Sequence, residues 1–236
     1  MSERVLVVQH EDQCAPAWFG RWLEQAGCEL DVRRPYAGSP LPPGLADHDA
    51  MLVLGGHMGA YDDEEFPWLT EVKALVREAV GAAVPTFGIC LGHQLITVAL
   101  GGTVVVNPRG QQIGVLPIGW LEEPDELFSA MPAAGIQWNN DVVAELPPGA
   151  TALARTPSGE LQVARFAPTV WGVQLHPEAD RRVVSPWAEH DRAHQGDAVV
   201  DRALDEVERA EPGLLADWEK VAAGFAVVVA DRIRTD

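Results

Sequence analysis

The first half of the chain alternates short apolar runs with longer amphipathic segments, and this alternation limits the fold more than any other feature of the sequence. The apolar runs that predict strands are 5–8, 29–33, 50–54, 83–87 and 103–106. Apolar residues at helical spacing occupy 15–26, 66–80 and 91–100. Strands and helices that alternate in this way form right-handed βαβ units. We therefore predict an α/β fold with a doubly wound, mostly parallel sheet flanked by helices, and chemistry at the carboxyl ends of its strands.

From about residue 112 the pattern changes to shorter apolar runs separated by turns, and about the last fifty residues return to helical spacing. The shorter strands are predicted at 113–118, 151–154, 161–166 and 170–174. Val200, Leu204 and Val207 have the spacing of one buried helix face, and a second such face runs from Leu215 to Val229. We therefore predict one domain over residues 1–184 and a helical C-terminal extension over 185–236 that packs on it.

Charge and cysteine content narrow the class of protein. The 236 residues include 17 Lys and Arg against 35 Asp and Glu, which gives a formal net charge of −18. A chain this acidic is repelled by nucleic acids and by anionic membranes. Three cysteines are too sparse for a disulfide framework, and there is neither a signal-peptide pattern nor an apolar run of about 18 residues. We expect a cytoplasmic protein with no nucleic-acid or membrane partner.

The segment 86–94 reads TFGICLGHQ and places a cysteine between a predicted strand and a predicted helix. Gly88 and Gly92 permit a sharp strand-to-helix turn around Cys90, as in a nucleophile elbow. The N–H groups and the dipole at the start of a helix favour the thiolate form of a cysteine placed there. The alternative is a small buried cysteine that only fills space at a strand end.

A second segment, 170–178, ends a predicted strand at a histidine and places a carboxylate two residues later. A thiol nucleophile needs a base within hydrogen-bond reach, and the base needs a partner that fixes its tautomer and orientation. His176 and Glu178 supply both, and Pro177 stiffens the turn between them. The alternative is a surface His-Pro turn followed by a solvated glutamate.

Two glycines, Gly55 and Gly56, mark the end of a third predicted strand. Glycines let the backbone approach a ligand closely and direct an N–H group at it, as an oxyanion hole requires. A glycine pair alone also fits an ordinary tight turn. Because the cysteine, the histidine with its carboxylate and the glycine pair all follow strands of one sheet, we expect them to meet at one edge of it.

Taken together, these motifs resemble the class I, triad-type glutamine amidotransferase family. The matching residues are Gly55-Gly56 and the segments 88–94 and 174–178, and the resemblance extends over roughly residues 4–180. The sequence is similar to stand-alone members and to the amidotransferase domain of GMP synthases. The resemblance implies a flavodoxin-like α/β domain that cleaves the γ-amide of glutamine through a cysteine thioester and releases ammonia and glutamate.

The family's site residues carry over by position. The resemblance implies that Cys90 attacks the amide carbon, that His176 accepts and returns the proton, and that Glu178 orients the histidine. It places the tetrahedral oxyanion against the backbone N–H groups of Gly56 and Leu91. The positions that it implies for substrate binding are Gly55, Gln94, Gln112, Ile113 and Gly114.

The chain departs from the family pattern at two places. Many stand-alone relatives have Trp-His-Gly-Asp where this chain has Trp138-Asn139-Asn140-Asp141. His57-Met58-Gly59 follows the glycine turn, where relatives often have Gly-Pro. The sequence therefore leaves open the role of the 138–141 loop and the geometry of the oxyanion hole.

The motifs leave three functions open. The first is a glutamine amidotransferase that supplies a separate ammonia-consuming synthetase, and the second is a free-standing γ-glutamyl hydrolase or peptidase that acts on γ-glutamyl peptides or amines. The third is a binding or regulatory protein without turnover, which the complete cysteine, histidine and glutamate set disfavours. We expect the first. We expect no cofactor and no metal, because His190 and His194 stand four apart but have no third ligand.

Overall fold

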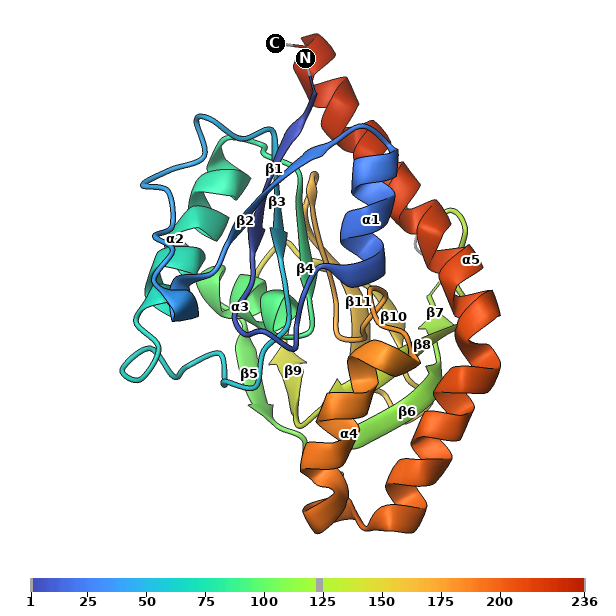
Figure 1. Ribbon diagram of the computed structural model, residues 1–236. Helices are drawn as coiled ribbons and strands as arrows, with labels where there is room; N and C mark the ends of the chain where they lie inside the picture. Colours follow the sequence, from blue (N-terminus) through green and yellow to red (C-terminus); the bar gives the residue numbers. More distant parts are fainter. Residues whose placement is uncertain (1, 122–124, 236) are drawn as a thin grey trace.

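The computed structural model describes residues 2–121 and 125–235, and strands and helices alternate along the first half of the chain as predicted (Figure 1). The helices are α1 (Ala17–Gln25), α2 (Trp68–Gly81), α3 (Leu91–Ala99), α4 (Arg181–Gln195) and α5 (Asp197–Thr235), with a short 3₁₀ helix η1 (Pro35–Ala37). The strands are β1 (Arg4–Val8), β2 (Glu29–Arg33), β3 (Ala50–Val53), β4 (Thr86–Ile89), β5 (Thr103–Val106), β6 (Gln112–Pro117), β7 (Gly119–Trp120), β8 (Ala134–Asn139), β9 (Asp141–Glu145), β10 (Thr151–Arg155), β11 (Leu161–Ala167) and β12 (Val170–Val173).

Eight strands form the central sheet, in the order β2-β1-β3-β4-β12-β11-β10-β7. The first five are parallel to one another, and β11, β10 and β7 continue the sheet with antiparallel pairing that begins between β12 and β11. The predicted fold class, a mostly parallel α/β sheet flanked by helices, is confirmed. Because β3, β4 and β12 are adjacent and parallel, the residues that follow them emerge side by side at one edge of the sheet.

Strand β1 shows how the sheet is covered on both faces. Val5 and Val7 belong to the apolar cluster formed with α1 and α5, whereas Leu6 and Val8 belong to the cluster formed with α2 and α3. All four residues are fully buried. Successive side chains of a strand point to opposite faces, so an uninterrupted apolar run suits a strand between two helix layers. Figure 1 shows α1 and α5 on one side of the sheet and α2 and α3 on the other.

Two expectations about the strands are corrected. The run 103–106 does not join the central sheet, because β5 pairs with β9 in a separate two-stranded sheet, and β6 pairs with β8 in another. The strand predicted at 83–87 begins only at Thr86, because residues 82–84 still close the C-terminus of α2 and Pro85 has no N–H to donate. The strands β7, β8 and β9 lie outside the predicted runs because their sequences mix polar and apolar residues.

The two C-terminal helices pack on the same core as the sheet. Phe225 of α5 is fully buried, with its ring centroid 5.7 Å from that of Phe87 in β4. Trp218, also in α5, donates from Nε1 to the carbonyl oxygen of Ala134 in β8 (3.1 Å). Helix α4 begins at Arg181, so the boundary predicted between residues 184 and 185 falls inside a helix. The division into a domain and an extension remains a prediction.

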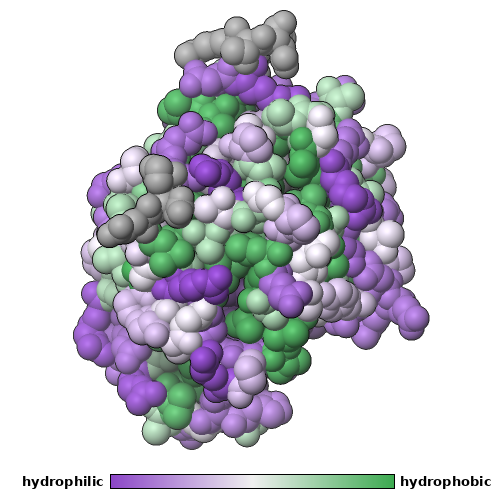
Figure 2. Space-filling model, turned by 180° about the vertical axis from the view of Figure 1, so that it is seen from behind, coloured by the Kyte–Doolittle hydropathy of each residue, from purple (hydrophilic) through white to green (hydrophobic). Residues whose placement is uncertain are grey.

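The outer surface is mostly polar. Figure 2, which shows the molecule from behind, has hydrophilic side chains over most of the face, with smaller hydrophobic patches between them. The exposed large apolar side chains of the described residues are Tyr61, Val105, Val106, Leu121, Met131 and Val227. Within the described ranges, no helix has the length and apolar character needed to cross a membrane.

Candidate active site

Cys90 lies at a sharp turn between β4 and α3. Its backbone φ of +50° is in the left-handed region, and the residue is buried. A Cβ added at Gly92 would lie 2.1 Å from the carbonyl oxygen of Val53, and one at Gly88 would lie 2.7 Å from the backbone carbonyl carbon of Gly92. Any side chain at either position would force the turn apart. The turn therefore depends on both glycines and has the geometry of a nucleophile elbow.

His176 and Glu178 lie beside Cys90, in the turn that follows β12. The Nδ1 atom of His176 is 2.8 Å from Oε1 of Glu178, and both side chains are almost completely buried. The backbone N–H of His176 donates to the carbonyl oxygen of Ile136 (2.8 Å), and the ring packs against Trp187 with centroids 4.7 Å apart. These contacts hold the ring with Nδ1 at the carboxylate and leave Nε2 for a second partner.

The charges around His176 favour its protonated form. Burial lowers the pKa of His176, but the Glu178 carboxylate and Cys90 outweigh burial and raise the pKa well above its ordinary value of 6.5. An imidazolium beside a cysteine stabilises the thiolate, which is the nucleophilic form. The three side chains can therefore act as nucleophile, proton carrier and orienting carboxylate.

The glycines after β3 bring the backbone of that loop against the same side chains. A Cβ at Gly55 would lie 3.1 Å from Cε1 of His176 and 3.6 Å from Cβ of Cys90. The backbone N–H groups of Gly56 and Leu91 have no acceptor within the described residues. Unpaired N–H groups beside a nucleophile are what an oxyanion hole needs.

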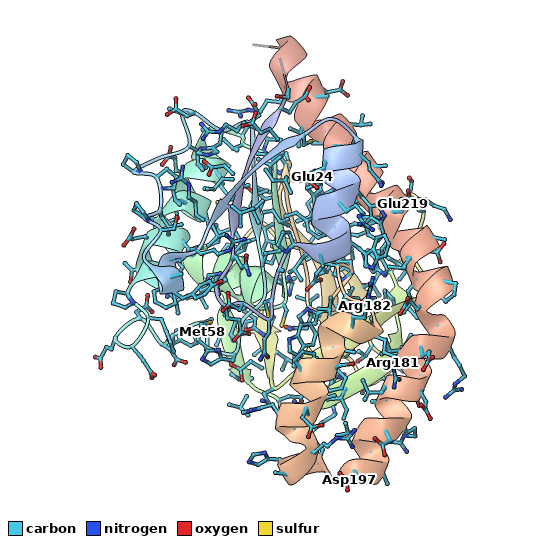
Figure 3. All side chains as sticks on the ribbon, viewed as in Figure 1. Glu24, Met58, Arg181, Arg182, Asp197 and Glu219 are labelled. Carbon is cyan, nitrogen blue, oxygen red and sulfur yellow. The ribbon has the colours of Figure 1, made fainter. Side chains whose placement is uncertain are left out.

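Beside these groups lies a cavity of about 1000 Å³, at the carboxyl ends of the parallel strands. The residues of the predicted site that line it are Cys90, His176, Gly56 and Gln94. Gly55, Leu91 and Glu178 are not part of the lining and support it from behind. Figure 3 shows Met58, another lining residue, at this end of the strands.

The structure does not bring the predicted substrate contacts at Gln112, Ile113 and Gly114 into the cavity. All three lie in β6, and a Cβ at Gly114 would lie 2.9 Å from Oε2 of Glu206 in α5. The preceding residue, Gln111, lines the cavity instead. A short apolar run does not show which of its residues face the site, because that depends on how the strand packs against α5.

The 138–141 loop, whose role the sequence leaves open, lines the cavity and is linked to the nucleophile by side-chain amides. Gln94 donates from Nε2 to the backbone carbonyl oxygen of Asp141 (3.2 Å) and to Oε1 of Gln174 (3.3 Å). Gln174 in turn places Nε2 3.7 Å from Sγ of Cys90. The loop is therefore one of the walls against which a substrate would rest.

Helix α4 supplies a further wall that the motifs do not indicate. Trp187, His190 and Asp191 line the cavity from this helix. Asp191 accepts hydrogen bonds at Oδ2 from Nε1 of Trp138 (2.8 Å) and from Nε2 of Gln111 (2.7 Å), which joins α4 to the opposite wall. The sequence indicates only that Trp187, His190 and Asp191 share one face of a helix, because they are three and four positions apart.

A second cysteine, Cys14, also lines the cavity. Burial and the charge of Glu11 raise the pKa of the Cys14 thiol far above its ordinary range, and its Sγ donates to Oε1 of Glu11 (3.0 Å). Cys14 therefore stays a thiol, whereas Cys90 has a histidine partner. In the part of the chain that the structure describes, no group of three or more His, Cys, Asp or Glu side chains is arranged to hold a metal ion.

Comparison with known proteins shows the family to which the chain belongs. The family model described as glutamine amidotransferase class-I matches residues 18–186, which is more than half of the chain. The chain belongs to the class I glutamine amidotransferase family. This confirms the resemblance that the cysteine, histidine and glycine motifs carry.

Three relatives of the chain in this amidotransferase family carry names that indicate different activities. It is 31% identical to the glutamine amidotransferase-like protein YfeJ of Salmonella typhimurium, over 85% of the chain and 86% of YfeJ. It is 38% identical to a subunit of the glutamine-hydrolysing GMP synthase of Saccharolobus solfataricus, over 66% of the chain and 79% of that protein. It is 27% identical to gamma-glutamyl peptidase 5 of Arabidopsis thaliana, over 67% of the chain and 65% of that protein.

The amidotransferase fold is also seen among solved structures. A glutamine amidotransferase from Thermotoga maritima matches the chain with a TM-score of 0.85 at 24% identity, over 96% of this chain and 99% of the other. At that identity the match shows the fold alone. Because it covers almost the whole chain, the shared architecture includes helices beyond the residues that the family model matches.

Proposed function

We propose that the chain hydrolyses the γ-amide of glutamine, with Cys90 as the nucleophile, and releases glutamate and ammonia. The observation that carries this proposal is that the Cys90 turn, the His176–Glu178 pair and the glycine loop after β3 meet at one cavity. Each feature has a plain structural explanation when taken alone. Together they provide a nucleophile, a proton carrier with its orienting carboxylate, and oxyanion donors.

The reaction proceeds through a thioester. The Cys90 thiolate attacks the carbonyl carbon of the γ-amide, and the oxygen that gains charge accepts hydrogen bonds from the N–H groups of Gly56 and Leu91. The carbon–nitrogen bond breaks as His176 gives its proton to the nitrogen, which leaves as ammonia. Water then attacks the thioester, His176 accepts a proton from it, and the carbon–sulfur bond breaks to give glutamate and the free cysteine. Glu178 keeps the histidine oriented through both steps.

The released ammonia would serve a separate synthetase in the cytoplasm. Relatives named as subunits of glutamine-hydrolysing GMP synthase support a role as one component of such a two-protein system. All three cysteines, Cys14, Cys28 and Cys90, are free, which suits a reducing compartment. We propose Gln94 as the contact to the amino-acid end of the substrate, because it lines the cavity one helical turn after the nucleophile.

A second candidate is a free-standing γ-glutamyl hydrolase with the same chemistry and a larger leaving group. The observation that favours it is the size of the cavity, about 1000 Å³, because small-molecule pockets span roughly 300–1,000 Å³ and glutamine is among the smallest ligands. The match to gamma-glutamyl peptidase 5 points in the same direction. In this case an amine or a peptide nitrogen takes the proton from His176 in place of ammonia.

Glutamate release by the purified chain tests the proposal, with glutamine, a γ-glutamyl peptide and a γ-glutamyl amine offered in parallel. We expect Cys90→Ala to lower turnover at least about 10⁴-fold, because no other group at the site forms a thioester with the γ-glutamyl carbonyl carbon. The γ-glutamyl thioester seen by mass spectrometry after acid quenching should be lost as well. Cys28→Ala removes a thiol outside the cavity and is the matched control. Full turnover by Cys90→Ala would overturn the assignment of Cys90 as the nucleophile. If the wild-type chain shows neither turnover nor a thioester with any of the substrates, the result would indicate a binding protein.

A further inference from the structure

Acidic side chains are concentrated on the walls of the cavity. Among the described residues that line it, none is Lys or Arg. The acidic lining residues are Glu11, Asp12, Asp62, Asp141 and Asp191. They come from the loop after β1, the loop before α2, the start of β9 and helix α4. The tertiary structure therefore gathers negative charge from four distant segments around the opening to Cys90.

None of these carboxylates forms an ion pair with a described Lys or Arg. Glu11 is paired with His57 (2.7 Å), which is largely exposed. Asp62 accepts a hydrogen bond from the backbone N–H of Gly59 (2.7 Å), and neutral donors of this kind leave the negative charge in place. The side chain of Asp141 has no hydrogen-bond or ion-pair partner in the described part of the chain, although the residue is half-buried.

Asp141 and Asp62 are close enough for their negative charges to repel each other. Burial raises the pKa of the Asp141 carboxyl, and the negative charge of Asp62 raises it further. Two carboxylates that repel each other at the wall of a cavity are both stabilised when a cation binds between or beside them.

A buried acceptor next to these carboxylates gives a second, independent observation. Asn139 lines the cavity and is only 5% exposed, and its Nδ2 donates to the carbonyl oxygen of Asp141 (3.1 Å). Its Oδ1 accepts no hydrogen bond from any described residue. A buried amide oxygen without a donor is costly, so a ligand that brings an N–H group is favoured there. An ammonium group has three N–H donors and a positive charge, and it satisfies both requirements.

We propose that the substrate of this site is a γ-glutamyl amine whose leaving amine carries a second, protonated amino group. This inference rests on the second candidate function, in which Cys90 hydrolyses γ-glutamyl compounds with a larger leaving group than ammonia, and it names the substrate class of that function. The thiolate forms the same thioester, the carbon–nitrogen bond breaks, and the diamine leaves with the proton from His176. Water then releases glutamate from Cys90. The ammonium at the far end of the leaving group lies among the acidic lining residues.

The charges of the competing substrates explain this choice. Glutamine carries one positive and one negative group at its amino-acid end and no further charge, so it gains little from an acidic cavity. A γ-glutamyl peptide adds a carboxylate, which the acidic lining repels. A γ-glutamyl diamine adds a positive charge, and opposite charges across a binding site favour encounter and select the partner.

Three matched substrates test the inference: the γ-glutamyl amides of diaminobutane, of pentylamine and of aminobutyrate, which end in an ammonium, a methyl group and a carboxylate. We expect kcat/KM to be about tenfold higher for the ammonium than for the methyl substrate, and lowest for the carboxylate. This preference should shrink as salt rises, because ions screen charges near an open cavity. Formation of the Cys90 thioester is also followed with the pentylamine substrate, because it tests hydrolysis by Cys90 independently of the charge on the leaving group.

Two variants connect the preference to the cavity. Asp141→Asn and, separately, Asp62→Asn should lower the ratio of ammonium to methyl kcat/KM at least about threefold, since each removes one negative charge. Glu65→Gln removes an exposed charge from the same acidic run as Asp62, outside the cavity, and should leave the ratio unchanged. Two variants are used so that a folding defect in one does not decide the result.

The outcomes separate the two proposals. Equal kcat/KM for the three substrates, or a preference for the carboxylate, with the Cys90 thioester still formed, would overturn the diamine assignment and leave the hydrolase intact. Failure to form a thioester with any of them would overturn the hydrolase and the diamine assignment together. A preference for the ammonium that neither Asp141→Asn nor Asp62→Asn reduces would overturn the role of the acidic lining.

Discussion

The ring of His176 is subject to two opposed influences from its surroundings. Burial lowers its pKa, while the Glu178 carboxylate, 2.8 Å from Nδ1, and Cys90 raise the pKa by more than burial lowers it. The imidazolium therefore persists to a higher pH than that of an exposed histidine. At the scale of single residues, the carboxylate thus acts through charge as well as through orientation.

Glu178→Gln separates these two contributions, because glutamine keeps the shape of the side chain and removes its charge. We expect the pKa of His176 to fall, so that the alkaline limb of the kcat/KM profile moves to lower pH. We also expect kcat/KM near neutral pH to fall about 10²-fold or more. The pH dependence of glutamate release measures both effects. An alkaline limb that does not move would show that another group sets the protonation of the histidine.

At the scale of elements, the turn between β10 and β11 is organised by one buried carboxylate. Glu160 accepts hydrogen bonds from the hydroxyl groups of Thr156 and Ser158 and from Nη1 of Arg109 (2.7 Å). Burial raises the pKa of Glu160, but these hydrogen bonds outweigh burial and lower the pKa to about 2. Because Arg109 precedes the cavity residue Gln111 by two positions, the turn also anchors the segment that leads into the site.

Glu160→Gln should therefore lower the free energy of unfolding by about 2 kcal/mol at pH 7. The folded-state pKa is the lower one, so the carboxylate's contribution is complete above pH 4.5 and is lost as pH falls toward 2. Urea unfolding at a series of pH values should show that the difference in free energy of unfolding between the variant and the wild type decreases as pH falls from 4.5 to 2. Glu219→Gln, at an exposed glutamate labelled in Figure 3, is the control. A difference that stays constant to pH 2 would assign the effect to packing.

At the scale of the whole molecule, α5 closes one face of the central sheet. Its side chains join the cluster that contains Phe87 of β4, so the strand that leads to Cys90 is supported by a helix far along the chain. The same helix packs against α1, α4 and β6, and α4 lines the cavity with Trp187, His190 and Asp191. The stability of the site therefore depends on the C-terminal helix although that helix contributes no residue to the described lining.

Phe225→Ala tests this dependence, and we expect it to lower the free energy of unfolding by about 3–5 kcal/mol, because it leaves a cavity at a fully buried position. Val227→Ala, two residues away and 59% exposed, should change it by less than about 0.5 kcal/mol. Unfolding should remain a single transition if residues 185–236 pack on the same domain. Two separate transitions, with only one shifted, would divide the chain into independent units.

The strands and helices of the first half could be predicted because their apolar runs are continuous, as in Val5 to Val8, where both faces of the strand are covered. The residues around Cys90 and His176 could be predicted because a turn with glycines at positions 88 and 92, and a histidine with a carboxylate two positions later, are local patterns. The contacts expected at 112–114 could not be placed, because the direction in which β6 faces is set by α5, about 90 residues later.

By itself, the sequence determined the class of fold, the family and the segments that carry a nucleophile, a base and a glycine turn, since each depends on the order of neighbouring residues. Only the tertiary structure decided what surrounds them. The wall from α4, the lining by the 138–141 loop and the acidic residues of four segments come from positions far apart in the chain. The physical reason is that the charge and shape of a cavity are sums over all the elements that enclose it, whereas periodicity and motifs record one element at a time.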